Sequence, residues 1–300
     1  MSYTELRRRL DDFAARRRLL GLREHVQRER FIRCLIESEK KLRALRMKKF
    51  SGHTDPLKEG FDPLQAIVED FKTNEYDEAI WLAFLCIHFG WTNQAGKVSD
   101  SVRLFYGKFG KGTWDWKTVV RSPVGVKEWM SELSKAQLRQ LRFGNHQKFE
   151  TNNPRSPIGT AAVIASFVGW VRQNGESSAW QAFDSASKIA STPESAFDHL
   201  CESLNQVKRF GRTARFDLLC LLGNLGILNV TPAHCYLRNA TGPKAGAMLL
   251  VTGNKKGKLT PRVEETIQEL RSTLGVAVEA MEDALCNWQK GKGFLSRVCL

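Results

Sequence analysis

Apolar residues recur along most of this chain at intervals of three and four positions, which is the spacing of one face of an α-helix. The alternation of apolar and polar residues that is typical of β-strands is scarce. The clearest apolar face near the N-terminus consists of Leu6, Leu10, Phe13, Leu20, Phe31, Leu35, Leu42 and Leu45. The pattern predicts an all-α protein without internal repeats.

Further helices are expected wherever the same spacing resumes after a break. Three of them have well-marked starts, because an N-cap threonine precedes a first-turn proline at Thr192, Thr231 and Thr260. The turn-rich segment 51–63 separates a basic helical segment, residues 1–55, from the main domain, residues 56–300. The expected helices cover residues 75–89, 99–108, 126–139, 157–172, 179–190, 193–208, 213–224, 231–239, 243–251 and 261–289.

The formal net charge of +14 favours a polyanionic partner, most simply nucleic acid, with an acidic membrane surface as the alternative. Residues 1–50 hold 16 Lys and Arg against 7 Asp and Glu, a net charge of +9. The N-terminal helix is either a solvated face or an arm that tracks phosphates. In the second interpretation the DNA backbone is contacted by Arg7, Arg8, Arg9, Arg16, Arg17 and Arg18.

Seven cysteines, an odd number, lie mostly within apolar helical patterns and indicate reduced thiols in a cytoplasmic protein. His199 with Cys201 and His234 with Cys235 lack the spacing of a zinc site, so neither a metal ion nor another cofactor is expected. No apolar run approaches 18 residues, and the N-terminus has no apolar signal core. We therefore expect no association with a membrane and infer no obligate protein partner.

The segment 209–217 combines arginines and one carboxylate with an apolar sequence. Helical spacing places Arg212, Arg215 and Phe216 on one side, with Asp217 about 100° around the helix from Phe216. Buried charges of this kind are costly unless something is bound to them. The segment is either an internal ion pair or an anion-binding arginine pair beside a catalytic carboxylate.

A second polar segment, residues 142–148, offers donors and acceptors suited to a base edge or a water molecule. Asn145 and His146 are the candidates for that role, and Arg142 and Lys148 are candidates for binding substrate or phosphate. The alternative is an ordinary surface loop. Most of the eight tryptophans are expected in the core, although one or two could stack an extruded base.

A third segment, residues 237–250, is expected to form a short helix, a glycine turn and a second helix. The N-terminus of the second helix exposes backbone N–H groups, and together with Thr241, Gly242 and Lys244 it would hold a phosphate of the DNA backbone. The alternative is a plain turn between helices in which Gly242 is the C-cap.

Four segments resemble a known family: RFGNHQKFET, PIGTAAVIASFVGWV, FGRTARFDLL and ATGPKAGAMLL. They are similar to the bacterial and phage α-glutamyl/putrescinyl thymine pyrophosphorylases, particularly the third clade, over about residues 75–255. The basic N-terminal segment has no counterpart among these motifs. The resemblance implies a divergent helical branch of the DNA-glycosylase superfamily. In that branch phage members replace an activated substituent on thymine with an amino acid or amine, and bacterial relatives excise glucosylated hydroxymethylcytosine from viral DNA.

The resemblance also implies that residues 240–247 form a helix-hairpin-helix motif. Here the hairpin lacks the usual second glycine, and the aspartate expected about 20 residues downstream is replaced by the segment Arg262–Glu265. The usual catalytic aspartate is therefore missing from this chain, and Asp217 becomes the candidate catalytic residue. Lys244 is assigned to phosphate rather than to attack on the sugar.

The resulting hypothesis is a monofunctional DNA glycosylase for anti-phage defence. It would flip a hypermodified 5-substituted pyrimidine out of double-stranded phage DNA and leave an abasic site. Asp217 would stabilise the oxocarbenium-like charge and activate water, Asn145 and His146 would contact the base, and Arg212 and Arg215 would hold phosphate or substituent hydroxyls. The alternatives are a transferase that displaces pyrophosphate from a 5-hydroxymethyl pyrimidine and a non-catalytic DNA-binding protein.

Overall fold

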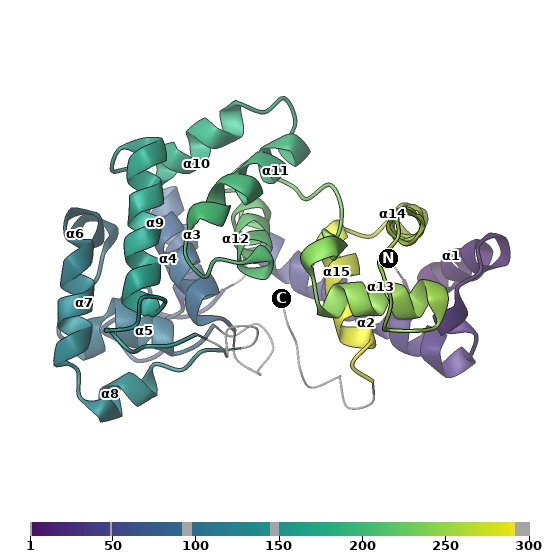
Figure 1. Ribbon diagram of the computed structural model, residues 1–300, viewed down its shortest axis with the longest axis horizontal. Coiled ribbons are helices and arrows are strands. Elements are labelled where there is room, and N and C mark those ends of the chain that lie inside the picture. Colours follow the sequence, from purple (N-terminus) through teal and green to yellow (C-terminus); the bar gives the residue numbers. More distant parts are fainter. Residues whose placement is uncertain (1, 49, 92–97, 145–149, 292–300) are drawn as a thin grey trace. The chain divides into compact units, whose positions relative to one another are not determined.

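The structure is a computed structural model, and it describes residues 2–48, 50–91, 98–144 and 150–291 (Figure 1). These residues contain fifteen α-helices and four short 3-10 helices, and they contain no β-strand. The only β-type pairing among them is two isolated bridges, His53 with Phe61 and Trp91 with Val98. The prediction of an all-α protein is confirmed.

The α-helices are α1 (Tyr3–Arg16), α2 (His25–Arg46), α3 (Pro63–Lys72), α4 (Tyr76–Phe89), α5 (Ser101–Tyr106), α6 (Trp116–Arg121), α7 (Pro123–Glu132), α8 (Lys135–Gln140), α9 (Thr160–Gly175), α10 (Ala179–Lys188), α11 (Pro193–Ser203), α12 (Arg212–Asn224), α13 (Gly242–Thr252), α14 (Pro261–Leu274) and α15 (Val278–Trp288). The 3-10 helices are η1 (Leu20–Leu22), η2 (Lys108–Gly110), η3 (Leu204–Gln206) and η4 (Leu237–Asn239).

The chain divides into two compact units. Unit 1 contains Met1–Leu45 and Pro232–Leu300, and unit 2 contains Arg46–Thr231. The N-terminal segment therefore shares a unit with the last helices of the chain, which differs from the two consecutive domains expected on either side of residue 55. The physical reason is that the apolar face of α1 is buried against α14, and η1 packs on α13.

Unit 1 has a single apolar core in which α15 lies between α13 and α2 (Figure 1). Trp288 meets Phe31 of α2 edge to face, with ring centroids 5.5 Å apart. On the other side α13 approaches α15 closely, because a Cβ at Gly246 would lie 2.1 Å from the carbonyl oxygen of Leu285. Glycine at this position is what allows the two helices to touch.

Unit 2 is built around α4, in which every residue from Ala79 to Phe89 is buried. Such a helix, apolar on all sides, belongs in the middle of a core. Phe84 of α4 stacks on Phe167 of α9 with ring centroids 4.0 Å apart. The indole N–H of Trp81 donates to the carbonyl of Trp114 at 2.7 Å. The expectation that most tryptophans are core residues is confirmed, because the buried residues include Trp81, Trp91, Trp114, Trp116, Trp170 and Trp288.

Three helix predictions are wrong, each for a local reason. Residues 231–236 are not helical, and Tyr236 adopts a left-handed conformation with φ of 46°, so only η4 precedes Ala240. The helix expected at 261–289 ends at Gly275, whose φ of 67° makes it the C-cap of α14. The helix expected at 126–139 is interrupted because Ser134 forms a capping box with Gln137 and starts α8.

Candidate functional site

The start of α12 holds the arginine-rich segment in a strained turn. Arg209 has a left-handed φ of 61°, which is unfavourable for a side chain of this size. The N–H of Gly211 donates to the carbonyl of Arg209 at 2.9 Å, and α12 begins at the next residue. Phe210 between them is buried and stacks on Phe84 of α4, with ring centroids 5.2 Å apart. The core contact of Phe210 therefore determines where α12 starts.

Arg212 occupies the first turn of α12 and is buried, with 9% of its surface exposed. Its guanidinium carbon lies 4.5 Å from the centre of the Phe216 ring, a distance suited to a cation–π interaction. Arg212 and Phe216 thus share one face of the helix, as the spacing predicts.

Arg215 lies one turn further along α12 and binds the end of α11. Its Nη1 donates to the carbonyl of Cys201 at 2.7 Å, while its Nε is buried without a hydrogen-bond partner. Burial raises the pKa of the Cys201 thiol, and the charges of Arg215 and Arg212 oppose this rise. Both arginines therefore lie near Cys201, and Arg215 also stabilises the carboxyl end of α11.

Asp217 lies between buried Phe216 and buried Leu218 and is itself only partly exposed. Its neighbours on both sides face the core of unit 2, so its carboxylate stands at the margin of the buried face of α12. The structure thus places the candidate carboxylate on the helix that carries Arg212 and Arg215.

A bidentate ion pair joins the arginine-rich turn to the other polar segment. Arg209 donates from Nε and Nη2 to Oε1 of Glu150, at 3.0 and 2.8 Å. The side chain of Glu150 is only 8% exposed and that of Arg209 is 35% exposed. The carboxylate raises the pKa of Arg209. Sequence reasoning missed this pair, although Glu150 lies within the first motif of the family resemblance and Arg209 directly precedes the third.

Of the polar segment itself, Asn145, His146 and Lys148 lie outside the described residues. Arg142 is exposed, and its backbone N–H donates to the hydroxyl of Ser101 at 2.6 Å. Gly144 donates its N–H to the carbonyl of Phe89 at 2.7 Å. The segment is therefore attached to the carboxyl end of α4 where it enters the polar loop.

His88 is a buried polar residue that sequence reasoning missed, because it stands in the apolar run of α4. Its Nε2 lies 3.0 Å from the hydroxyl of Thr160, which donates to the side-chain oxygen of Asn152 at 2.8 Å. Because that hydroxyl has a single hydrogen, it accepts from an Nε2–H of His88, and this defines the tautomer. Burial lowers the pKa of His88 to about 4, so the imidazole is neutral.

The hydrogen bonds of His88 continue to the polar segment. The amide of Asn152 donates to the carbonyl of Leu141, so the two ends of segment 141–152 are tied together. The ring of Phe143 meets His88 edge to face at 5.6 Å, and the ring of Phe84 stacks on the other side at 6.1 Å. Residues 141–144 and 150–152 thus converge with segment 209–217 on the carboxyl half of α4, and we call this arrangement the motif junction.

Glu78 is a second titratable group of α4; it is partly buried and lies outside the motif junction. It accepts hydrogen bonds from the Tyr106 hydroxyl at 2.7 Å and from the Trp116 backbone N–H at 2.8 Å. Burial raises its pKa to about 7 although these donors oppose the rise. Ten residues of helix separate Glu78 from His88, which is about 15 Å, so the two groups cannot act on one atom.

In unit 1 the expected phosphate-binding hairpin has an unexpected form. The first helix is only the 3-10 turn η4, and α13 already begins at Gly242, so Gly242 is not a C-cap. A Cβ at Gly242 would lie 2.5 Å from Sγ of Cys286, which shows that this glycine faces α15. Thr241 is exposed and its side chain makes no capping bond. Within the described chain, Lys244 has no ion-pair partner.

Most of the arginines predicted to contact DNA from α1 are engaged in ion pairs. Arg16 donates to the carbonyl of Asp12, and Arg18 is exposed. The pairs are Arg7 with Glu29 at 3.3 Å, Arg8 with Glu5 and Asp12 at 3.0 Å each, Arg9 with Glu5 at 2.7 Å, and Arg17 with Glu269 at 2.9 Å.

A buried polar cluster that sequence reasoning missed joins α2 to α15. The carboxylate of Asp283 accepts from Ser38 at 2.6 Å, from Lys41 at 2.9 Å and from Asn287 at 2.6 Å. Burial raises the pKa of Asp283, and the ammonium of Lys41 opposes this. Every donor is directed at one carboxylate, so the cluster holds the two helices in register.

Neither a metal centre nor a membrane span is found in the described parts of the chain. No group of three His, Cys, Asp or Glu residues there is arranged to hold a metal ion. Among the same residues, no helix combines the length and the apolar character that crossing a membrane requires.

Comparison with protein-family models matches residues 26–296 to the alpha-glutamyl/putrescinyl thymine pyrophosphorylase clade 3. The match confirms the resemblance carried by the four motifs. It also begins within α2, so it extends over part of the N-terminal segment for which the motifs offered no counterpart. No curated protein and no solved structure matches the chain.

Proposed function

We propose that this chain, which belongs to the alpha-glutamyl/putrescinyl thymine pyrophosphorylase family, clade 3, is a DNA glycosylase specific for hypermodified pyrimidines. The family relates the chain to enzymes that process modified thymine. The substrate in this proposal is a 5-substituted pyrimidine in double-stranded phage DNA, such as a glucosylated hydroxymethyl base, and the biological role is anti-phage defence.

The observation that carries the proposal is the motif junction. Two polar segments separated by about 60 positions are joined by the bidentate pair of Glu150 with Arg209 and meet at the carboxyl half of α4. An ordinary surface loop at one segment and an internal ion pair within the other would not require contacts between the two segments. Their convergence supports one site that is assembled from both segments, beside the helix that carries Asp217.

In the proposed reaction the target nucleotide is flipped out of the duplex, at a cost of a few kcal/mol. The bond from C1′ to the base nitrogen breaks, its electrons leave with the base, and a water oxygen bonds to C1′. Asp217 takes a proton from that water and stabilises the positive charge that develops on the sugar. Arg212 binds phosphate or the hydroxyls of the substituent, and Asn145 and His146 contact the base.

The second candidate is a transferase, and the name of the family favours it, because a pyrophosphorylase acts on pyrophosphate. In that reaction Arg212 and Arg215 bind a pyrophosphate leaving group on a 5-hydroxymethyl pyrimidine. The amine nitrogen bonds to the exocyclic carbon while the carbon–oxygen bond to pyrophosphate breaks, and the glycosidic bond stays intact.

Incubation with hypermodified phage DNA distinguishes the candidates. A glycosylase releases a free modified base and leaves alkali-labile abasic sites, which mass spectrometry and gel analysis detect. A transferase leaves the strand intact and, when an amine is supplied, forms a new nucleoside and releases pyrophosphate. DNA that binds without any chemical change would refute both candidates and leave a non-catalytic binding protein.

A further inference from the structure

Unit 1 carries most of the positive charge of the chain. Its two segments, 1–45 and 232–300, contain 23 Lys and Arg against 13 Asp and Glu, a net charge of +10. The longer unit 2 contains 23 against 19, a net charge of +4. A charge of this size attracts a polyanion, but only cations without acidic partners can neutralise phosphates.

The loop between α13 and α14 presents such cations on an ordered backbone. Gly253 ends α13 with a left-handed φ of 75°, and the N–H of Asn254 donates to the hydroxyl of Thr252. The side chain of Asn254 in turn accepts from the N–H of Lys256 at 2.9 Å. Lys256 and Lys258 are exposed, and no acidic residue in the described chain lies within ion-pair distance of either.

A second segment contributes cations at the same end of α13. A Cβ at Gly21 would lie 2.3 Å from the carbonyl oxygen of Leu249, so η1 rests directly on the last turns of α13. Leu20 of η1 also lies against Gly253. Arg18, two residues before η1, and Arg23, directly after it, are exposed and have no ion-pair partner among the described residues.

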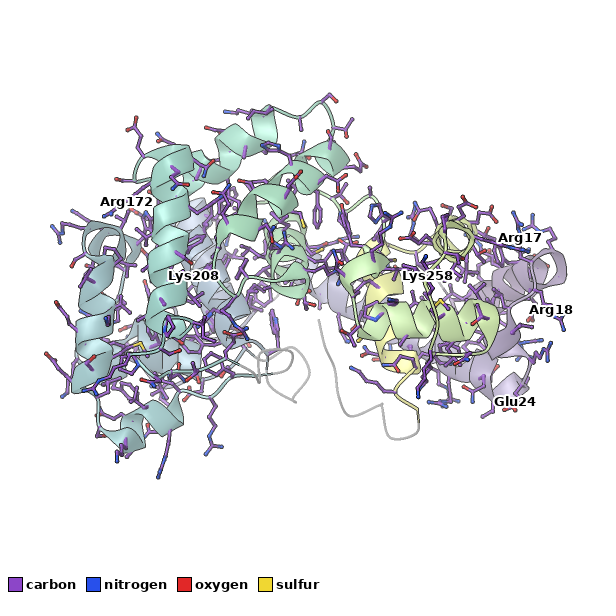
Figure 2. The ribbon with its side chains drawn as sticks, viewed as in Figure 1. Arg17, Arg18, Glu24, Arg172, Lys208 and Lys258 are labelled. Atoms are coloured by element: carbon purple, nitrogen blue, oxygen red, sulfur yellow. The ribbon has the colours of Figure 1, made fainter. Side chains whose placement is uncertain are left out.

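Four exposed cations therefore lie within five residues, along the chain, of the contact between η1 and the carboxyl end of α13. We call them the α13-end cluster: Arg18, Arg23, Lys256 and Lys258. Figure 2 labels Arg18 at the margin of unit 1 and Lys258 on the α13–α14 loop. The carboxyl end of α13 carries only about half a negative charge, which is too little to neutralise four cations.

We propose that the α13-end cluster binds the phosphate backbone of duplex DNA and supplies most of the salt-dependent affinity of the protein. The proposal rests on the proposed function, which makes DNA the substrate. Exposed lysines act as point charges on phosphates and read no sequence, so the cluster would hold any duplex while unit 2 recognises the modified base. The paired arginines of α1 contribute less, since their charge is already neutralised within unit 1.

The test is the salt dependence of binding to an unmodified 30-base-pair duplex, measured by fluorescence anisotropy. The full-length protein is compared with the triple variant Arg18→Gln, Lys256→Gln and Lys258→Gln. Each lost phosphate contact lowers the slope of log K against log[salt] by about 0.9, so we expect a decrease of roughly 2 to 3 in its magnitude and a loss of affinity of more than tenfold at 100 mM salt.

A matched control removes the same formal charge elsewhere. The variant Lys40→Gln, Lys72→Gln and Lys188→Gln replaces three exposed lysines that pair with Glu37, Glu69 and Asp184. Surface pairs of this kind add little stability, so this variant should fold and keep the wild-type slope. Circular dichroism verifies the fold of both variants. Lys256→Arg with Lys258→Arg keeps the charge and should keep the slope.

An unchanged slope in the α13-end variant, or an equal decrease in the control, would overturn the inference. So would binding of the wild type to anionic phosphatidylserine vesicles but not to the duplex. Failure of the proposed function is separate, since a protein that binds the duplex through this cluster but changes no modified base would refute the glycosylase assignment alone.

Discussion

At the scale of single residues, three carboxylates of unit 2 have surroundings that differ sharply. Asp217 is partly exposed, the side chain of Glu150 is almost fully buried, and Glu78 is partly buried outside the motif junction. The free energy of each carboxylate is therefore set by the donors and charges nearby. Three predictions follow the three groups in turn.

Replacing Asp217 by Asn should abolish base release while leaving DNA affinity within about threefold of wild type. The carboxylate is proposed to act on charge that develops in the transition state, so its loss affects turnover rather than binding. We expect a decrease in kcat on the order of 10³-fold or more, measured by release of the modified base. The exposed Asp100→Asn serves as a control, and near wild-type turnover in Asp217→Asn would discard the assignment.

Removing Arg209 should leave the buried carboxylate of Glu150 without its main partner. Arg209→Met is expected to lower the free energy of unfolding by about 2 kcal/mol, because an uncompensated buried charge is costly. Adding Glu150→Gln should recover part of that loss, which gives a coupling energy of about 1–2 kcal/mol in a double-mutant cycle from urea unfolding. Additive effects of the two substitutions would show that the pair is energetically unimportant.

Glu78 should make stability depend on pH. Its pKa is raised from 4.5 to about 7 in the folded protein. Its favourable contribution to the free energy of unfolding is therefore fully present below pH 4.5 and is lost as the pH rises through 7. In Glu78→Gln the amide can accept from the Trp116 N–H and donate to Tyr106, so this loss disappears. The variant should gain on the order of 2 kcal/mol relative to wild type between pH 5 and pH 8, measured by thermal unfolding.

At the scale of elements, helix packing relies on glycines that have no role in turns. Gly246 lets α13 touch α15, whereas Gly169 in α9 has no atom within 4 Å of its Cβ position. A side chain at Gly246 would therefore clash with a neighbouring helix, whereas a side chain at Gly169 would not. The difference cannot be read from either helix alone, because it depends on the neighbouring helix.

Gly246→Ala should destabilise the protein by about 3 kcal/mol, because the new Cβ would overlap a backbone carbonyl that cannot move away. Gly169→Ala is the matched control, and it should stabilise by about 0.5–1 kcal/mol through helix propensity alone. Denaturant unfolding measures both. Equal effects of the two substitutions would mean that α13 and α15 pack less closely than the structure describes.

At the scale of the whole molecule, unit 1 is composed of the two ends of the chain. Leu6, Leu10 and Phe13 are buried in the same core as Leu270 and Leu274 of α14. The N-terminal segment is therefore a structural part of unit 1, whatever its arginines bind. The basic N-terminal helix is therefore not a free arm, because its apolar face packs on the core of unit 1.

Deleting residues 1–45 should unfold the remainder of unit 1 and not merely weaken DNA binding. The deletion exposes the apolar faces of α14 and α15, so residues 232–291 should become sensitive to protease while unit 2 keeps its helices. Limited proteolysis with mass spectrometry detects this. Protection of residues 232–291 in the shortened chain would show that the C-terminal helices fold without α1 and α2.

The sequence by itself determined the helical class, the helix starts at Thr192 and Thr260, and the family, because helical spacing, capping residues and motifs are local properties. Only the tertiary structure decided that Glu150 meets Arg209, that His88 supports the polar segment through Thr160, and that α1 packs on α14. Each of these depends on contacts between residues far apart in the chain. Residues 231–236 show that local signals can also mislead. Thr231 and Pro232 predict a helix start, but the chain is not helical there and Tyr236 adopts a left-handed conformation.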